Sequence, residues 1–367
     1  MTETNKDNQS MTTSESGHKV TVAPSGRSFS THNGETILAA AIRAGIGLPY
    51  GCRDGACGSC KCKKLEGAVV HGPHQPRALS AEEEQAGMIL TCSAVALGDV
   101  VIESRQVTDE SAFPVKKLPV RIARMSRLAH DVMELRLQLP AGTPLRYHAG
   151  QYIEFVLKDG ARRSYSMANA PHTLATEPMV QLHLRHMPGG LFTDHVFGAM
   201  KEKDILRIEG PFGSFYLRED GSKPIIALAS GTGLAPIKAL IEHLQHLGST
   251  RPITLYWGAR RPRDLYLDAW VRAQQQAMPQ LTYVPVASDA LPEDGWQGRT
   301  GFVHQAVLQD FADLSGHEVY ACGAPVVVDA ALAAYTKERG LPPEAFYADA
   351  FTSEADKHDA RPEAATL

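Results

Sequence analysis

The sequence predicts three modules in a row: a small mixed α+β unit, a β-barrel and an open parallel α/β sheet. Three observations support this multidomain fold. Short strand and helix signals alternate within residues 19–107. Between residues 119 and 220, short alternating strands are separated by Gly and Pro. From residue 221 to 351, buried strand runs alternate with helical segments, as they do in a parallel sheet covered by helices.

The first module, residues 19–107, contains a hairpin signal and two helix signals. Apolar residues on both sides of a Pro-Ser-Gly turn predict a hairpin near the start of the module. Residues 36–44 predict an apolar helix that Gly45 ends. Ser80 and Glu83 have the spacing of a capping box and predict the start of a second short helix.

Four cysteines of this module have the spacing C-x4-C-x2-C with a fourth further along: Cys52, Cys57, Cys60 and Cys92. This spacing is typical of a plant-type 2Fe-2S cluster, which carries single electrons. Gly55 and Gly58 let the loop approach an anionic cluster and direct backbone N–H groups to its sulfurs. We expect the loop to lie at an edge of the module, near solvent, where electrons could pass to a partner.

Zinc and disulfides are the alternatives for these cysteines. Structural zinc sites usually combine two short-spaced ligand pairs, whereas three thiols crowd one loop here. Cys62 lies two residues beyond Cys60 and would point the same way on a strand. It is either a spare thiol beside the cluster or, as we expect, a packed structural one. His71 and His74 do not adjoin the loop, which disfavours a Rieske-type centre.

The composition is that of a globular protein of two or three domains. The chain has 367 residues, 37 basic and 41 acidic side chains and a formal net charge of -4. We therefore expect no nucleic-acid or membrane partner. Six cysteines leave no disulfide framework beside a cluster, which fits a reducing compartment. Residues 1–18 are polar and lack the apolar core of a secretory signal, so we expect a disordered N-terminus and a cytoplasmic protein.

Residues 108–118 lack periodicity, and we interpret them as a linker. The barrel that follows contains the run Arg163-Ser164-Tyr165-Ser166. An arginine can neutralise a phosphate, a tyrosine can cover a flavin ring and a serine hydroxyl can hydrogen-bond a ring nitrogen. A plain surface strand is the alternative for this run.

A second barrel motif lies between residues 183 and 193. Gly189 and Gly190 precede an apparent helix start and would form an anion cradle. Arg185 could join that cradle. The alternative is a turn followed by an ordinary helix cap.

The third module opens with a buried strand run, residues 225–229, that leads into Gly231, Thr232 and Gly233 and then a helix. The glycines let backbone N–H groups approach a pyrophosphate at the helix N-terminus. Pro236 takes the place of the third glycine of the usual dinucleotide fingerprint. A lone G-x-G can be a plain tight turn, but the strand–turn–helix setting favours nucleotide binding.

Two later strands end in candidate residues at the same edge of this sheet. Arg260 and Arg261 could flank the adenosine part of a nucleotide, or they could be solvated surface charges. Cys322 is either a buried small residue or a group near a nicotinamide, and Gly323 follows it. Residues 352–367 form a charged tail that we expect to fray.

Together these motifs resemble the ferredoxin-NAD(P)+ reductase superfamily, and more narrowly reductases with an N-terminal plant-type ferredoxin of β-grasp fold. The resemblance covers residues 19–351. The CDP-6-deoxy-3,4-glucoseen reductase group is the most similar in residues 48–52, 163–167 and 185–190. The reductase components of oxygenases share the same architecture. The resemblance implies that the barrel binds FAD and that the parallel sheet binds NADH or NADPH.

The resemblance also implies roles for single residues. Arg163 would meet the FAD phosphates, Tyr165 would stack on the flavin and Ser166 would face its reactive nitrogen. The residues with an implied catalytic role are Tyr165, Ser166 and Cys322. Those with an implied cofactor contact are Arg163, Tyr165, Ser166, Arg185, Gly189, Gly190, Thr193, Gly231, Thr232, Gly233, Arg260, Cys322, Gly323 and Phe351.

These expectations combine into one predicted activity. A nicotinamide gives up two electrons at once and a cluster carries one, so a flavin between them can convert the pair into single electrons. We predict an NAD(P)H-dependent oxidoreductase that passes electrons from NAD(P)H to FAD, to the cluster and to a partner protein such as a CDP-deoxysugar dehydrase. A mono- or dioxygenase component is the alternative partner, and a non-enzymatic iron–sulfur carrier or redox sensor is a third possibility. We expect NADH to be preferred.

Overall fold

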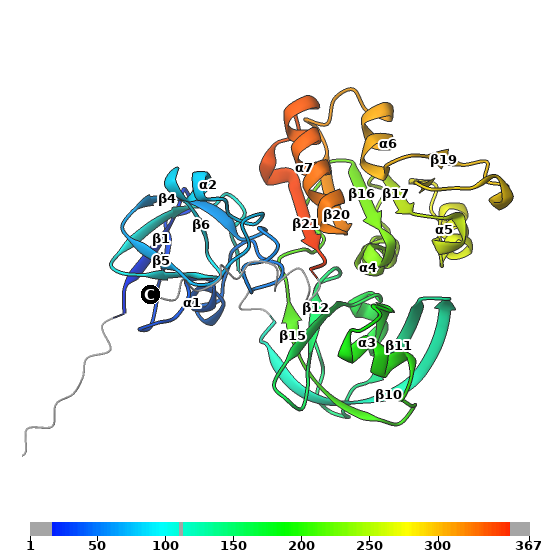
Figure 1. The fold of residues 1–367 in the computed structure, drawn as a ribbon, viewed down its shortest axis with the longest axis horizontal. Coiled ribbons are helices and arrows are strands. Elements are labelled where there is room, and N and C mark those ends of the chain that lie inside the picture. The colour runs from blue at the N-terminus through cyan, green and yellow to red at the C-terminus, as the bar shows by residue number, and fades with distance from the viewer. Residues whose placement is uncertain (1–16, 110–112, 353–367) are drawn as a thin grey trace, which may run out of the picture.

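The computed structural model describes residues 17–109 and 113–352, which form three units in chain order (Figure 1). The first unit, in blue, lies beside the other two. The barrel, in green, and the third unit, in yellow to red, lie one above the other in this view. Among the described residues, no helix is both long enough and apolar enough to span a membrane.

The first unit is built on a mixed sheet with the order β2-β1-β8-β4-β6 in the described residues. Its elements are β1 (Lys19–Ala23), β2 (Arg27–Ser30), α1 (Ile37–Arg43), β3 (Ile46–Gly47), β4 (Lys61–Glu66), β5 (Val69–His71), α2 (Ala81–Gln85), β6 (Met88–Leu90), β7 (Ala94–Ala96), β8 (Val100–Glu103) and β9 (Thr108–Asp109). The hairpin β1–β2 and the parallel pair β1–β8 form its centre.

Local sequence signals explain both helices of this unit. The side chain of Thr36 accepts a hydrogen bond from the Ala39 N–H and begins α1. Ser80 and Glu83 form the reciprocal capping box that the sequence predicts at the start of α2. The apolar residues of β1 and α1 are buried in the core of the unit.

The second unit is an antiparallel sheet of the order β13-β12-β15-β10-β11-β14, again counted over the described residues. Its elements are β10 (Lys116–Ala129), β11 (Val132–Gln138), β12 (Tyr152–Val156), β13 (Arg162–Ser166), η1 (Pro171–Ala175), β14 (Met179–Arg185), α3 (Leu191–Phe197) and β15 (Ile205–Phe212). A bridge between Met167 and Leu182 joins its two outer strands, so the sheet closes into the expected barrel.

The third unit is a parallel sheet, whose order within the described part of the chain is β19-β18-β17-β16-β20-β21. Its elements are β16 (Ile225–Ser230), η2 (Gly231–Gly233), α4 (Leu234–His246), β17 (Ile253–Ala259), η3 (Pro262–Asp264), α5 (Asp268–Ala277), β18 (Leu281–Ala287), η4 (Pro292–Asp294), β19 (Arg299–Thr300), α6 (Val303–Asp310), β20 (Glu318–Gly323), α7 (Pro325–Glu338), η5 (Pro343–Ala345) and β21 (Phe346–Ala350). The chain order reverses at β16, which pairs with β17 on one side and β20 on the other. Ligands bind at such a switch point in open α/β sheets.

The expected linker differs from the structure, and the expected disordered ends of the chain lie mostly outside the described residues. Within residues 108–118, interpreted as a linker, Thr108–Asp109 pairs with β3 and β10 already begins at Lys116. The lack of side-chain periodicity therefore hides two short pieces of strand. Most of the expected disordered N-terminus, residues 1–18, and nearly all of the expected tail, residues 352–367, lie outside the described residues.

Candidate functional site

The four cysteines with cluster spacing gather as two pairs of thiols. The neighbouring Cys57 thiol is the main cause that raises the pKa of Cys52, and the Cys92 thiol is the main cause that raises that of Cys60, so the two thiols of each pair lie close together. Among the described residues, which include every cysteine, no disulfide forms and no three metal-binding side chains converge as one ion requires. Two pairs of thiols instead suit two tetrahedral irons, each held by two thiolates. The residues therefore fit a 2Fe-2S cluster.

The loop that carries three of these cysteines has a backbone suited to close approach. Gly55 and Gly58 have φ values of 76° and 79°, in the left-handed region that favours glycine, and Arg53 has a φ of 65°. A Cβ atom on Gly55 would lie 2.9 Å from the carbonyl oxygen of Pro73. This contact explains why glycine is needed at that position.

Backbone donors already point toward these thiols. The N–H of Cys52 donates to Sγ of Cys57, and the N–H of Ala56 donates to Sγ of Cys52, each at 3.4 Å. Such donors stabilise the negative charge of an iron–sulfur cluster. Cys62 lies on β4 outside both pairs, and burial raises the pKa of its thiol to about 12. It has the surroundings of a packed structural cysteine.

The cluster loop packs against the barrel, whereas the sequence suggests a loop near solvent. The hydroxyl of Tyr152 on β12 donates to the carbonyl oxygen of Gly51 at 2.7 Å. The hydroxyl of Tyr50 accepts a hydrogen bond from the Gly213 N–H at 2.9 Å. Within residues 51–60, Asp54 alone is exposed. Aromatic side chains of the barrel join the hydrophobic core of the first unit and cover one side of the loop, whereas Cys52, Cys57 and Ser59 stay partly exposed.

Arg53 adds charge and stacking to this interface. Its guanidinium lies 3.8 Å from the centre of the Phe212 ring, and its Nη2 lies 2.6 Å from Oε2 of Glu154. Glu154 is 3 % exposed and also accepts a hydrogen bond from Arg162 at 2.7 Å. A buried carboxylate between two guanidinium groups fixes the loop in one orientation on the barrel.

Ser166 ends β13, next to the strand that meets the cluster loop. Its backbone pairs with that of Tyr152. Its hydroxyl donates a hydrogen bond to Oδ2 of Asp349 on β21 at 3.1 Å. A Cβ atom on Gly51 would lie 3.3 Å from Sγ of Cys57 and 3.7 Å from Oδ1 of Asp349. All three units therefore meet at the expected flavin serine.

Asp349 is a buried carboxyl group at this junction. Burial raises its pKa to about 7, the hydrogen bond from Ser166 lowers it, and the nearby Cys57 thiol raises it. Asp349, Tyr152 and the Arg53–Glu154 pair are not among the residues that the sequence predicts for the site. Their partners lie far away along the chain, so no local motif marks them.

Tyr165 and Arg163 occupy the other face of β13, because side chains alternate along a strand. The Tyr165 ring lies 5.9 Å from the ring of Phe155 and 5.7 Å from that of Phe192, measured between centroids. Burial raises the pKa of its hydroxyl. Arg163 donates a hydrogen bond to the carbonyl oxygen of Arg162 at 2.8 Å.

The second barrel motif forms the start of α3. Gly189 has a φ of 84°, and its N–H donates to Oδ2 of Asp194 at 3.1 Å. The Thr193 hydroxyl donates to the carbonyl oxygen of Met187 at 2.9 Å. A Cβ atom on Gly190 would lie 2.8 Å from Oγ1 of Thr193. The turn is therefore closely packed, and a carboxylate oxygen of Asp194 lies where the Gly189 N–H would meet an anion.

Arg185 and the glycine turn of the third unit lie side by side. Nε of Arg185 lies 3.0 Å from Oδ2 of Asp131, and a Cβ atom on Gly231 would lie 2.8 Å from its Nη1. Thr232 lies between the two glycines, and a Cβ atom on Gly233 would lie 2.2 Å from the carbonyl oxygen of Cys322. Only glycine lets the turn rest against the end of β20.

Cys322 and Gly323 complete this sheet edge. Cys322 is 1 % exposed, and burial raises the pKa of its thiol. It pairs in register with Asp349, which brings the sheet edge to the junction at Ser166. The N–H of Phe351 donates to the carbonyl oxygen of Gly323 at 2.8 Å. The structure thus brings the barrel residues and the residues of the nucleotide turn together.

Arg260 and Arg261 follow β17 and are both paired with carboxylates. Arg260 is strongly exposed, with 82 % of its side chain accessible, and lies 3.3 Å from Asp289. Arg261 donates hydrogen bonds of 2.7 and 2.8 Å to the two carboxylate oxygens of Asp294. Their positive charges are therefore balanced within this loop region.

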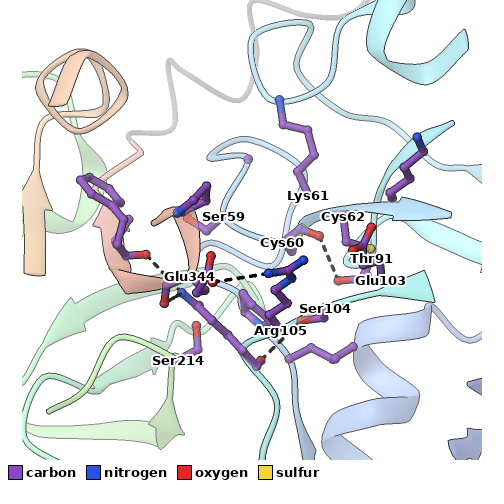
Figure 2. A pocket seen from close by; sticks show the side chains of 18 of the residues that line it. Ser59, Cys60, Lys61, Cys62, Thr91, Glu103, Ser104, Arg105, Ser214 and Glu344 are labelled. Carbon is purple, nitrogen blue, oxygen red and sulfur yellow. Dashed lines mark hydrogen bonds and ion pairs between the residues drawn. The ribbon is translucent and has the colours of Figure 1, made fainter. Parts of the chain in front are cut away.

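A cavity of about 720 Å³ lies between the first and third units beside the cluster loop (Figure 2). Cys60 and Cys62 are among the residues on one side, and Phe346 is on the other. Arg105 and Glu344, which also line the cavity, form an ion pair at 3.5 Å. The cavity reaches the Cys60 side of the thiol cluster, away from the contact between Tyr152 and Gly51.

Three family models match the chain in the order of its units. They describe a 2Fe-2S iron–sulfur cluster binding domain over residues 20–97, an oxidoreductase FAD-binding domain over residues 119–216 and an oxidoreductase NAD-binding domain over residues 227–332. The match assigns a cluster, FAD and a nicotinamide nucleotide to the three units.

Similar proteins span almost the whole chain. The CDP-6-deoxy-L-threo-D-glycero-4-hexulose-3-dehydrase reductase of Yersinia pestis is 38% identical over 90% of this chain and 98% of its own. Reductase component 2 of terephthalate 1,2-dioxygenase from Comamonas sp is 36% identical over 93% of this chain and 99% of its own. The crystal structure of the Amycolatopsis cytochrome P450 reductase GcoB has a TM-score of 0.74 and 32% identity, covering 92% of this chain and 99% of that one.

Proposed function

This chain belongs to the family of iron–sulfur flavoprotein reductases that join a 2Fe-2S ferredoxin domain to FAD- and NAD-binding domains, and we propose that its acceptor is a separate CDP-deoxysugar dehydrase. The chain is an oxidoreductase in which electrons pass from a nicotinamide nucleotide through FAD to the cluster. The order of the three units matches that route. The observation that carries it is the junction of the cluster loop, Ser166 and Asp349.

The residues of this junction have separate tasks in the proposal. Bound FAD supplies the conversion of a two-electron donor into a one-electron donor. Ser166 would orient its ring from a buried position, and Tyr165 with Arg163 would hold it from the other face of β13. Gly189, Gly190 and Thr193 would bind its pyrophosphate, with Arg185 supplying positive charge. The four cysteines would hold the cluster.

The nicotinamide nucleotide has its own set of residues. Gly231, Thr232 and Gly233 would bind its pyrophosphate through backbone N–H groups. Cys322 and Gly323 would lie beside the nicotinamide, and Phe351 would cover the outer face of the flavin. Buried residues such as Cys322 exclude water from the place where the two rings would meet.

We propose NADH as the preferred donor. The 2′-phosphate of NADPH needs an uncommitted cation at the end of the second sheet strand. The two candidates are already neutralised, Arg260 by Asp289 and Arg261 by Asp294. The carboxylates would also repel a phosphate.

An oxygenase component is the second candidate acceptor. The 36% identity to a terephthalate dioxygenase reductase supports it, because that relative is matched as completely as the dehydrase reductase. A non-enzymatic iron–sulfur carrier or sensor is excluded by the matched FAD- and NAD-binding domains.

The test begins with the purified protein loaded with FAD and cluster. Anaerobic NADH should bleach the flavin and then the cluster absorption. A CDP-6-deoxyhexulose dehydrase added next with its sugar-nucleotide substrate, which takes up the electrons, should reoxidise the cluster, and an oxygenase component added with its own metal centre oxidised should not. Reoxidation by the oxygenase component alone would overturn the choice of acceptor. Failure of either nicotinamide nucleotide to bleach the flavin would overturn the electron route.

A further inference from the structure

Lys238 is a buried basic residue among the mostly apolar buried residues of α4, and neither cofactor chemistry nor the cluster explains it. It lies on α4 and is 7 % exposed. A methionine or leucine would fill the same place without the cost of removing an ammonium group from water. The position therefore calls for a specific set of partners.

The partners of Lys238 belong to both the barrel and the third unit. Its Nζ donates to the carbonyl oxygen of Ala168 at 3.0 Å and lies 3.4 Å from Oε1 of Gln181. It also pairs with Glu242 one turn along the same helix. The ammonium lies 5.2 Å from the centre of the Trp270 ring, which adds a cation–π contact.

Glu242 completes the contact with the same barrel segment. Its Oε2 accepts a hydrogen bond from the Ala170 N–H at 3.0 Å. Lys238 and Glu242 thus bind both ends of the tripeptide 168–170. The residue between them, Asn169, is 2 % exposed and donates to the Thr173 hydroxyl at 2.8 Å, which keeps the tripeptide rigid.

The tripeptide 168–170 lies between the two proposed cofactor sites along the chain contacts described here. Ala168 lies two residues beyond Ser166, the proposed flavin contact, whereas α4 begins directly after the nucleotide turn at Gly233. The helix rises about 1.5 Å per residue, so Lys238 lies only about 7.5 Å along the axis from that turn. A rigid helix clamped to the flavin strand fixes the distance between the two cofactor sites.

We propose that Lys238 and Glu242 are positioning residues that hold the nicotinamide turn in register with the flavin strand across the interface of the barrel and the third unit. The inference rests on the proposed function, since it assigns the two sites to FAD and to the nicotinamide nucleotide. Neither side chain takes part in the chemistry. Misplacement by about 1 Å can slow a reaction on the order of a hundredfold, so a loosened clamp lowers the rate of hydride transfer.

The test compares Lys238→Met with Lys238→Arg and Glu242→Gln in the protein loaded with FAD and cluster. Flavin reduction at saturating NADH should slow between about tenfold and a hundredfold in Lys238→Met, with an unchanged NADH dissociation constant. Lys238→Arg, which keeps the charge, should recover part of the rate. Arg272→Met provides the matched control, because Arg272 forms an exposed pair with Asp268 at the same spacing on α5.

A second readout does not depend on electron transfer. Hydrogen exchange of the Ala170 amide, measured without nucleotide, should quicken in Lys238→Met and Glu242→Gln and stay unchanged in Arg272→Met. Unchanged exchange and unchanged flavin reduction in Lys238→Met would overturn the proposal. A higher dissociation constant with an unchanged limiting rate would also overturn it. If the wild-type flavin is not reduced by NADH, the proposed function fails, while the exchange data still decide whether the clamp exists.

Discussion

Tyr152 and Gly51 are joined by a hydrogen bond of 2.7 Å from the tyrosine hydroxyl to the glycine carbonyl oxygen. The backbone of Tyr152 pairs with Ser166, and Gly51 directly precedes the cysteine ligand Cys52. One side chain therefore connects the strand pair that carries Ser166 to the loop that carries Cys52. In the proposed electron route, this contact would join the flavin site to the cluster site.

Removing this hydroxyl should slow electron delivery to the cluster without affecting the flavin. Tyr152→Phe keeps the ring and leaves the Gly51 carbonyl unsatisfied, at a cost of about 1–3 kcal/mol in unfolding free energy. Stopped-flow absorption should show unchanged flavin reduction and slower cluster reduction. Tyr335→Phe is the matched control, because it removes a hydroxyl-to-carbonyl bond with His304 within the third unit. Equal cluster rates in both variants would contradict the assignment.

The Arg53–Glu154 pair should stabilise the docking of the cluster loop. Glu154→Gln weakens the hold on two guanidinium groups, and breaking such a buried pair costs about 3–5 kcal/mol. We expect Glu154→Gln to unfold at a lower urea concentration than the wild-type protein. We also expect its rate of cluster reduction to fall as the salt concentration increases. Glu35→Gln breaks the more exposed pair with Arg43 and serves as the control. A Glu154→Gln protein as stable as the control would refute this role.

Only four of the six cysteines should be needed for iron. Serine at Cys52, Cys57, Cys60 or Cys92 should abolish the visible absorption of the cluster and lower the iron content, while FAD remains bound. Cys62→Ser and Cys322→Ser should keep the iron, because neither thiol belongs to the two pairs. Iron analysis and flavin absorption measure both quantities. Loss of iron from Cys62→Ser would show that the ligand set is wrong.

Acid should destabilise the barrel through His148. Burial is the main cause that lowers the pKa of His148 to about 4 from an ordinary value of 6.5. As the pH falls from 6.5 to about 4, His148 becomes protonated in the unfolded chain but stays neutral in the folded chain. The free energy of unfolding therefore decreases across this pH range. The loss is about 3 kcal/mol at most. Unfolding by urea between pH 7 and pH 4 should show a shallower decline for His148→Gln, and equal slopes would contradict this cause.

The carboxylate beside Arg260 should restrict the use of NADPH. Asp289→Asn frees the exposed guanidinium for a 2′-phosphate, and a charge-assisted hydrogen bond of this kind is worth on the order of tenfold in kcat/KM. The kcat/KM for NADPH should rise while that for NADH stays unchanged. Glu344→Gln, which removes a carboxylate from an exposed arginine elsewhere, is the control. An NADPH value equal to that of the control would argue against this selection.

Local patterns predict much of the fold and mark the residues from which the candidate site is proposed. Short stretches of sequence predict the capping box at Ser80, the cysteine spacing and the strand–turn–helix at Gly231. The structure contains the capping box and the turn. These features depend on neighbours a few residues away. They are therefore readable without knowledge of the three-dimensional arrangement.

Contacts between the units could not be predicted in this way. Ser166 and Asp349 are separated by 183 positions, and Lys238 and Ala168 by 70. β21, which carries Asp349 as its fourth residue, is only five residues long and shows no clear strand pattern. The docking of the cluster loop likewise depends on aromatic residues of the barrel that become neighbours only after folding.

We propose that the cluster receives its electrons from the flavin of the same chain, across the contact between Tyr152 and Gly51. The most direct test mixes the loaded protein with excess NADH under anaerobic conditions and follows cluster reduction at several protein concentrations. Transfer within one molecule should give a first-order rate constant that does not change with protein concentration. A rate that rises in proportion to protein concentration would mean that electrons pass between molecules, and would contradict it.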